Sequence, residues 1–416
     1  MIHSRPYDVV MLGLGYIGLP TAAVIARSGL RVRGVDINQA TVDTINDGRV
    51  HIEERDLDAL VKDVVSRGLL SASTEVPEAD TFLIAVPTPL AAKNEPDVSH
   101  VFAALDLIIP RLRPGDCVIL ESTSPIGTTE GLAARLAAAR PDLCIPGHCD
   151  DGTHDIHIAY CPERVLPGQI IAELVSNDRV IGGLTPSCSE RAGAFYRRFV
   201  EGACLPTTAG AAEMVKLAEN SFRDVNIAFA NELSIIAEDH AIDVWDVIRL
   251  ANRHPRVNIL QPGPGVGGHC IAVDPWFLAA GSAHAPLIRT ARGVNDAKAL
   301  HVARQLKTML DERPDASMAL LGLTFKPNID DTRESPALQI AERLADEDAE
   351  RLLIVEPFLA ELPATLRDTG VRHCGFAEAM ERAELVAVLV DHTEFRDAPR
   401  SVVSGKQIYD TRGVWS

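Results

Sequence analysis

One turn constrains the fold more than any other feature of this 416-residue chain. The apolar run Asp8–Leu12 leads into Gly13-x-Gly15-x-x-Gly18, and a segment of mostly small and apolar residues follows. Strand, glycine turn and helix in this order are typical of a dinucleotide-binding fold, because the glycines let the backbone approach a pyrophosphate at the helix N-terminus. The alternative is a glycine-rich turn in an α/β fold that binds no cofactor. We expect this turn to bind a dinucleotide.

A carboxylate after the second expected strand indicates which dinucleotide is bound. The segment "RVRGVDI" contains Asp36, which lies 23 residues after Gly13. This spacing suits an acid that binds a ribose hydroxyl. The same carboxylate would repel the 2′-phosphate of NADP, so we predict NAD as the cofactor.

Further apolar segments of the first half each end in small polar residues or an acid. Ligands of open parallel sheets lie beyond the carboxyl ends of the strands, so we expect these residues to line one crevice. For the threonines the alternative is simple helix capping. The residues are Val86, Pro87, Thr88, Ser122, Thr123, Thr128, Thr129, Glu130, Glu163 and Arg164.

Composition excludes several classes of protein. The formal net charge of −18 argues against general nucleic-acid binding, which needs a basic face. No apolar run is long enough to span a membrane and no export signal precedes the first strand, so we expect a cytoplasmic protein. The eight cysteines show no C-x-x-C and no metal-like spacing. We therefore expect reduced thiols and no bound metal.

The middle of the chain predicts one long helix, because residues 211–240 contain neither glycine nor proline. Lys216, Asn220 and Arg223 are spaced to share one face of it. A solvated polar stripe is the alternative. Apolar neighbours such as Phe222 indicate an enclosed helix instead, whose polar face would need a ligand.

A second glycine-rich stretch, "GPGVGGHCIAVDPW", surrounds Cys270. Cysteine often only fills space in a core, but glycines here could present a thiol beside an anionic ligand. The basic residues His254 and Arg256, just upstream, fit a diphosphate. Exposed loop charges are the alternative for them.

The last third begins a new α/β layer at "SMALLGLTFKPNIDDTRESP". It lacks the glycine motif and carries Lys326 and Arg333 in its first loop, which favours a different nucleotide held by charge. The predicted fold class is α/β, with two Rossmann-like doubly wound domains joined by a central helical domain that contains the long helix. We expect the domains at 1–205, 206–310 and 311–416.

A hydride acceptor and a thiol together favour oxidation of an alcohol beyond the aldehyde. An aldehyde gives up hydride only after a nucleophile adds to its carbonyl, and the thiolate of Cys270 could add. Lys216 and Asn220 could stabilise the oxyanion. Asp274 and Glu163 are candidates to activate water or accept a proton.

Seven motifs together resemble the UDP-glucose/GDP-mannose dehydrogenase family along the whole chain: "GLGYIGLP", "VPTP", "STSPIGTTE", "YCPERVLPG", "KLAENSFRDVNIAFANE", "GPGVGGHCIAVDPW" and "FKPNIDDTRESP". The resemblance implies a four-electron oxidation of a UDP-sugar at C6 by two NAD+. The stretch "NRHPRVNILQPGPGVGGHCIAVDPWF" most resembles members that act on UDP-N-acetyl-D-mannosamine, for surface polysaccharide. Such enzymes are typically dimers built on the central helix, which implies a homodimer or a higher homo-oligomer.

The resemblance also implies roles for individual residues. Those implied in catalysis are Cys270, Lys216, Asn220, Asp274, Glu163 and Thr123. Those implied in NAD binding are Gly13, Gly15, Tyr16, Ile17, Gly18, Asp36, Val86, Pro87, Thr88, Ser122, Thr123, Thr129 and Arg333. Those implied in UDP-sugar binding are Arg164, Val165, Lys216, Asn220, Arg223, His254, Arg256, Gly267, Lys326 and Arg333.

Three alternatives remain open at this stage. The same chemistry could act on UDP-N-acetylglucosamine or UDP-glucose. A two-electron dehydrogenase of the 3-hydroxyacid type would leave Cys270 a structural role. A nucleotide-sugar sensor would keep the fold without catalysis.

Overall fold

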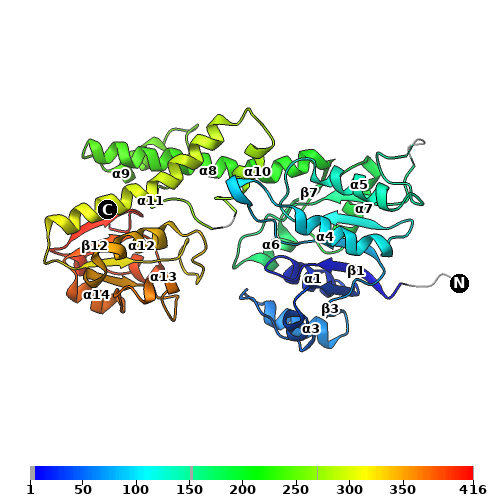
Figure 1. Ribbon diagram of the computed structural model, residues 1–416, viewed down its shortest axis with the longest axis horizontal. Helices are drawn as coiled ribbons and strands as arrows, with labels where there is room; N and C mark the ends of the chain where they lie inside the picture. Colours follow the sequence, from blue (N-terminus) through cyan, green and yellow to red (C-terminus); the bar gives the residue numbers. More distant parts are fainter. Residues whose placement is uncertain (1–4, 150–152, 269, 416) are drawn as a thin grey trace. The chain divides into compact units, whose positions relative to one another are not determined.

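The computed structural model describes residues 5–149, 153–268 and 270–415 (Figure 1). Contacts within the chain divide it into two units. Unit 1 comprises Met1–Ala218 and Trp276–Gly281, and unit 2 comprises Glu219–Pro275 and Ser282–Ser416. The three domains at 1–205, 206–310 and 311–416 stay a prediction.

An eight-stranded sheet forms the centre of unit 1, in the order β3-β2-β1-β4-β5-β6-β7-β8. Neighbouring strands are parallel except β6 and β7, which are antiparallel. The strands are β1 (Tyr7–Leu12), β2 (Val32–Val35), β3 (Leu70–Ser73), β4 (Ala79–Ile84), β5 (Cys117–Leu120), β6 (His157–Tyr160), β7 (Arg179–Gly183) and β8 (Cys204–Thr208).

Both faces of this sheet are buried. In β1, Val9 and Met11 join one hydrophobic cluster, and Val10 and Leu12 join a second cluster on the other face. Helices α1 and α3 supply the first cluster, whereas α4 and α5 supply the second. Burial of both faces explains why the strands are apolar throughout rather than alternating. The helices are α1 (Gly18–Arg27), α2 (Gln39–Asn46), α3 (Leu57–Ser66), α4 (Ser99–Ile108), α5 (Thr128–Ala139), α6 (Ile170–Ser176) and α7 (Pro186–Tyr196).

Unit 2 contains a five-stranded, wholly parallel sheet in the order β11-β10-β9-β12-β13. Met318 and Leu320 of β9 join a cluster with α11 and α12, and Ala319 and Leu321 join another with α14. The predicted α/β class with two Rossmann-like sheets is therefore confirmed. The strands are β9 (Met318–Leu321), β10 (Leu352–Val355), β11 (Arg372–His373), β12 (Leu385–Val388) and β13 (Gln407–Asp410). The helices after α8 are α9 (Val244–Ala251), α10 (Asp274–Ala280), α11 (Pro286–Glu312), α12 (Pro336–Asp348), α13 (Ala364–Arg367), α14 (Phe376–Arg382) and α15 (Thr393–Arg396).

The predicted long helix is confirmed as α8 (Ala209–Asp239), drawn in green in Figure 1. Within unit 2 it is joined to α11 by buried polar side chains. Arg292 donates to Asp224 at 2.6 Å, and Lys298 donates to Ser234 at 2.8 Å. A buried charge is tolerated when it is paired in this way. None of the helices in the described residues is both long and apolar enough to cross a bilayer.

The expectation that α8 is enclosed is wrong for part of its apolar face. Phe222 and Phe229 are 67% and 52% exposed, and Ile236 is also exposed. These positions are seven residues apart, so they form one stripe along the helix. This stripe, Phe222–Phe229–Ile236, is called the α8 stripe below.

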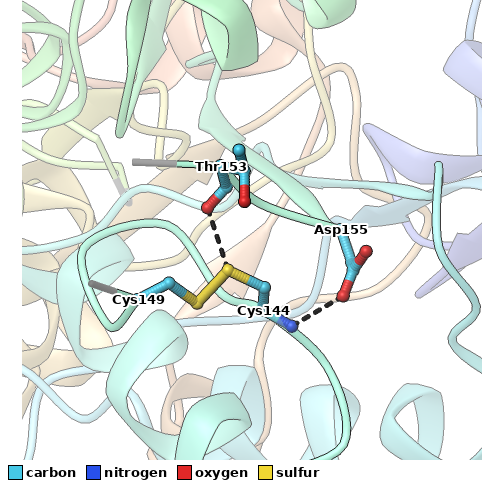
Figure 2. Close-up of a disulfide and its surroundings, with 4 residues drawn as sticks. All are labelled: Cys144, Cys149, Thr153 and Asp155. Atoms are coloured by element: carbon cyan, nitrogen blue, oxygen red, sulfur yellow. Dashed lines mark hydrogen bonds between the residues drawn. A yellow bond between two sulfur atoms is a disulfide. The ribbon is translucent and has the colours of Figure 1, made fainter. Parts of the chain in front are cut away.

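The expectation of eight reduced cysteines is also wrong. Cys144 and Cys149 form a disulfide, and their Cα atoms are 5.7 Å apart (Figure 2). The loop between them turns back on itself, which brings together two cysteines whose spacing is not a recognised motif. The other cysteines in the described residues are not disulfide-bonded.

Candidate functional site

The first glycine turn is shaped by close backbone packing. Gly13 has a φ of +89°, and a Cβ there would lie 2.4 Å from the carbonyl oxygen of Ala85. A Cβ on Gly18 would lie 1.9 Å from the carbonyl oxygen of Gly13. Gly15 is exposed, and a Cβ there would meet nothing within 4 Å. The turn is therefore closed on its inner side and open at Gly15, as a cradle for a pyrophosphate requires.

Asp36 lies directly after β2, and its carboxylate is oriented by the turn. One oxygen accepts the N–H of Leu14 at 3.0 Å, and the other accepts the N–H of Asn38 at 2.9 Å. Each carboxylate oxygen has a second lone pair, so these bonds leave capacity for ribose hydroxyls. The side chain of Tyr16 is about half exposed beside the turn. The geometry fits the predicted NAD site.

The polar residues after β4 and β5 lie at the carboxyl ends of these strands. Ser122 donates its hydroxyl to the carbonyl of Val86 at 2.8 Å, which ties the two strand ends together. Thr88 is buried, and Thr123 is half-buried. Their roles in binding NAD stay predictions.

Thr129 has a protein partner that the sequence did not indicate. Its N–H and hydroxyl donate to the carboxylate of Glu213 at 2.8 and 2.6 Å, and the N–H of Gly127 donates to the same group at 2.7 Å. Glu213 of α8 thus caps the N-terminus of α5, where a negative charge is favourable. Burial raises the pKa of Glu213, although these hydrogen bonds oppose the shift.

Glu163, after β6, is held by a buried arginine. Its carboxylate accepts from the Arg179 guanidinium at 2.8 Å and from the N–H of Arg164 at 2.7 Å. Both side chains of the ion pair are less than one-tenth exposed. Burial disfavours the charged guanidinium, but the neighbouring acidic groups, with Glu163 the largest of them, together outweigh burial and raise the pKa of Arg179.

A second carboxylate shares this buried environment. Glu121 accepts the hydroxyl of Tyr196 at 2.6 Å, and the guanidinium of Arg179 lies 5.5 Å from the centre of the Tyr196 ring. Burial raises the pKa of Glu121 to about 7, against the attraction of Arg179. Arg179 and Glu121 were not predicted from the sequence, where each is only a charged residue at the edge of an apolar strand.

In unit 2, the cysteine loop packs against the loop that carries the predicted basic residues. A Cβ on Gly267 would lie 2.4 Å from the carbonyl oxygen of Glu334, and one on Gly268 would lie 2.7 Å from the Phe325 ring. The N–H of Gly268 donates to the carbonyl of Arg333 at 3.2 Å. Glycine is therefore needed at these positions because two loops lie in contact. From the sequence we had expected these glycines to allow a ligand to approach.

Cys270 is exposed, and its loop is tied to α8 through Asp274. The carbonyl of Cys270 accepts the N–H of Asp274 at 2.9 Å. The Asn220 amide donates to the Asp274 carboxylate at 2.5 Å, and both side chains are buried. The structure thus brings Cys270, Asn220 and Asp274 together within unit 2.

The first loop of the second sheet repeats the arrangement of Asp36 with one difference. Glu356, directly after β10, accepts the N–H of Leu323 at 2.7 Å, as Asp36 accepts that of Leu14. Glu356 is buried and also lies 3.1 Å from the His392 ring nitrogen. Burial raises its pKa, but the contact with His392 and the hydrogen bonds from the N–H groups of Leu323 and Phe358 together hold that pKa low. An acid locked in this way is not available to a ribose, which fits the absence of the glycine motif from this domain.

The remaining predicted residues have mixed surroundings. Arg333 makes a two-point contact with Asp331, and this contact outweighs burial and lowers the pKa of Asp331. Arg164 donates to the carbonyl of Asp178 at 2.6 Å. Arg223, His254 and Arg256 are exposed, whereas Ile17, Val165, Lys216 and Lys326 are half-buried, and Val86 and Pro87 form the turn after β4. Their roles in binding stay predictions.

Three family models cover almost the whole chain. They describe the UDP-glucose/GDP-mannose dehydrogenase family: its NAD binding domain matches residues 7–200, its central domain residues 210–297 and its UDP binding domain residues 319–416.

Individual relatives match along nearly their full length. The NDP-N-acetyl-D-galactosaminuronic acid dehydrogenase of Ralstonia nicotianae is 54% identical, over 100% of this chain and 97% of its own. The UDP-N-acetyl-D-mannosamine dehydrogenase of Escherichia coli is 54% identical, over 98% and 99%. Among solved structures, the UDP-D-ManNAc dehydrogenase of Pyrococcus horikoshii aligns with a TM-score of 0.86 at 37% identity, over 98% and 96%. The UDP-N-acetyl-mannosamine dehydrogenase of Staphylococcus aureus aligns at 0.84 and 42%, over 98% and 95%.

Proposed function

This chain belongs to the UDP-glucose/GDP-mannose dehydrogenase family, and from that premise we propose that it oxidises C6 of UDP-N-acetyl-D-mannosamine to the carboxylate. It is an NAD-dependent UDP-sugar dehydrogenase. The exposed thiol of Cys270, fixed to α8 through Asp274, is the observation that carries the four-electron chemistry. The product is UDP-N-acetyl-D-mannosaminuronate, which the enzyme makes in the cytoplasm. This nucleotide sugar is a precursor of surface polysaccharide.

The NAD cofactor is held by the first glycine turn. The N-terminus of α1 and Gly15 would hold its pyrophosphate, and Asp36 would bind its ribose hydroxyls. When bound, NAD would supply the hydride acceptor for each of the two oxidations. The residues Tyr16, Ile17, Thr88 and Thr123 complete this binding site.

Oxidation proceeds through a covalent bond to Cys270. The C6 alcohol first loses hydride and a proton to give the aldehyde. The Cys270 thiolate then adds to the aldehyde carbon, forming a C–S bond and a thiohemiacetal. Loss of a second hydride and the hydroxyl proton gives the thioester, and water breaks the C–S bond to release the acid and the thiol. In total, one alcohol, two NAD+ and one water give one carboxylate, two NADH and three protons.

The side chains predicted to act in catalysis have distinct tasks. Lys216 and Asn220, on one face of α8, donate to the oxyanion of the thiohemiacetal and of thioester hydrolysis. Asp274 receives the hydrogen bond of Asn220 at 2.5 Å, which orients that amide. Glu163 activates water or accepts a proton, and its contact with Arg179 fixes its position.

The UDP-sugar is held by basic side chains and two loops. Arg164, Arg223, His254 and Arg256 supply positive charge to the sugar nucleotide in a chain whose net charge is −18. Lys326, with Val165 and Arg333, completes the set, and Gly267 lets the cysteine loop lie against the loop of Lys326.

A second candidate substrate is a UDP-N-acetylhexosamine of galacto configuration. The relative from Ralstonia nicotianae, named for a galactosaminuronic acid, is as identical to this chain as the relative from Escherichia coli, at 54%. One contact to a sugar hydroxyl can decide between such epimers, because an unpaired buried polar group is costly.

A substrate panel with counted NADH tests the proposal. UDP-N-acetylmannosamine, UDP-N-acetylgalactosamine, UDP-N-acetylglucosamine and UDP-glucose are each supplied as the limiting reagent. We expect the highest kcat/KM with the manno compound and two NADH per sugar. One NADH per sugar would identify the two-electron alternative, and no NADH with any sugar would identify a sensor.

A cysteine pair tests the covalent step. Cys270→Ser is expected to form no free acid, because serine does not supply a thiolate at neutral pH. Cys374→Ser, at a half-buried thiol on another part of unit 2, is the matched control and is expected to retain two NADH per sugar. Acid production by Cys270→Ser at the wild-type rate would refute the thioester route.

We also propose that the protein is a homodimer or a higher homo-oligomer. The α8 stripe supports this, since exposed apolar side chains in a row typically mark an interaction surface.

A further inference from the structure

Three side chains with metal-binding atoms meet on unit 1 at the start of β6, whereas the unit 1 residues predicted to bind NAD follow the carboxyl ends of strands. His157 is the first residue of β6, and His154 lies three residues before it. Cys188 lies in the first turn of α7. His154 Nε2 lies 3.3 Å from His157 Nδ1 and 3.7 Å from Cys188 Sγ. All three atoms lie within 4.8 Å of one another.

These separations match the edges of a small coordination tetrahedron. With metal–nitrogen bonds of about 2.0–2.1 Å and a metal–sulfur bond of about 2.3 Å, a tetrahedral ion separates two nitrogens by about 3.4 Å. The same ion separates nitrogen from sulfur by about 3.6 Å. We propose that His154, His157 and Cys188 form a binding site for a divalent ion of the zinc type, with water as the fourth ligand.

The sulfur of Cys188 lies among hydrogen-bond donors. The sulfur of Cys188 accepts hydrogen bonds from the N–H of Ile158 at 3.4 Å and from the hydroxyl of Thr185 at 3.2 Å. Donors of this kind stabilise a metal-bound thiolate.

Asp155, the residue after His154, is held in place by Cys144. The N–H of Cys144 donates to the Asp155 carboxylate at 2.8 Å (Figure 2). The N–H of Asp155 donates to the Cys144 carbonyl at 2.7 Å. The disulfide from Cys144 to Cys149 closes the same loop. Ser187 lies 3.1 Å from His154 Nε2 on the α7 side. The histidine is thus positioned before a metal binds, which reduces the entropy lost on binding.

Sequence spacing did not reveal this site. His154-x-x-His157 is a common spacing, but Cys188 follows 31 residues later on another element. The antiparallel pairing of β6 with β7 places the end of β7, and so the N-terminus of α7, beside the start of β6. Only this contact completes the set.

Cobalt binding to the full-length, tag-free and metal-stripped protein tests the proposal. We expect one Co²⁺ per chain, with a sulfur-to-cobalt charge-transfer band and the intense visible bands of tetrahedral cobalt. Added Zn²⁺ should displace the Co²⁺ and abolish these bands. His154→Ala is expected to weaken Zn²⁺ binding at least about 10-fold, since even loss of an outer hydrogen-bond partner costs that much. His148→Ala, at an exposed histidine of the same loop, is the matched control with unchanged affinity.

Cys188→Ser is expected to abolish the charge-transfer band. If that variant does not fold, His157→Gln, at a half-buried site, replaces it and is expected to lose affinity as His154→Ala does. Absence of tight binding, or tight binding that these variants leave unchanged, would overturn the proposal. In the latter case the ion would bind another thiol, such as exposed Cys270.

Discussion

At the scale of single residues, several carboxylates of this protein have defined hydrogen-bond partners. Asp36 and Glu356 have the same relation to a loop N–H, but only Glu356 is also bonded to a buried histidine. Glu163 is bonded to Arg179 in the same manner. Unpaired charges at such sites would be strongly destabilising, so each partner is as important as the residue predicted to act.

Removal of Arg179 should destabilise unit 1 and impair catalysis. Arg179→Met leaves Glu163 buried without its counter-ion, which is expected to lower the free energy of unfolding by about 3–5 kcal/mol. Arg197→Met breaks an exposed ion pair with Glu190 and is the matched control, with a loss below about 1 kcal/mol. Urea unfolding of both variants measures the difference. Equal urea midpoints for the two variants would show that the buried ion pair stabilises the protein no more than the exposed one.

The raised pKa of Glu121 predicts a pH dependence of stability. In the folded chain its pKa is about 7, against an ordinary value of 4.5, so the folded state keeps a proton that the unfolded state releases. Protonation of Glu121 therefore stabilises the folded state fully below about pH 4.5, and this contribution is lost as the pH rises to about 7. Glu121→Gln keeps an acceptor for Tyr196 and removes the titration. The variant should therefore gain up to about 3 kcal/mol relative to wild type across this range, and parallel pH profiles of unfolding would contradict the prediction.

At the scale of elements, the cysteine loop takes its position from a second loop and from α8. Gly267 and Gly268 of the cysteine loop have no room for a side chain, because another loop lies within van der Waals distance of their backbone. Asn231 of α8 accepts the N–H of Gly263 at 2.8 Å and so fixes the start of this loop. The long helix thus acts as the support from which Asn220 and Asn231 hold the loop at two points.

Two glycine substitutions should have opposite effects on stability. At Gly267 a new Cβ would lie 2.4 Å from a backbone oxygen, so Gly267→Ala must displace one of the two loops and should reduce both kcat and the unfolding midpoint. At Gly293, inside α11, a Cβ meets nothing within 4 Å. Gly293→Ala is therefore expected to stabilise the protein by about 0.5–1 kcal/mol with unchanged activity. Thermal unfolding and initial rates measure both effects, and wild-type activity in Gly267→Ala would contradict the proposed packing role.

At the scale of the whole molecule, the α8 stripe leaves apolar surface that one chain does not cover. Phe222 and Phe229 are large side chains, and each would bury substantial apolar area in contact with a second copy. A self-complementary helix face is typical of a two-fold interface. This surface gives a physical reason for the expected oligomer.

Charge on this stripe should dissociate the oligomer. Phe229→Glu is expected to shift the mass measured by light scattering toward that of one chain, because a carboxylate would be buried without a partner. Glu232→Gln, at an exposed position on the same helix, is the matched control with an unchanged mass. A monomeric wild-type protein, or an oligomer that Phe229→Glu leaves intact, would refute the prediction.

The sequence by itself determined the α/β class, the two Rossmann-like sheets, the NAD cofactor and the family, because glycine spacing and apolar periodicity act locally along the chain. It also placed the reactive candidates at strand ends and on one helix face. Only the tertiary structure decided which groups meet. The Glu163–Arg179 pair, the cap of α5 by Glu213, the Cys144–Cys149 bond and the cluster at Cys188 each join residues from different elements or across a turn. Such contacts depend on how the elements pack, and the spacing of residues along the chain does not specify which elements come into contact.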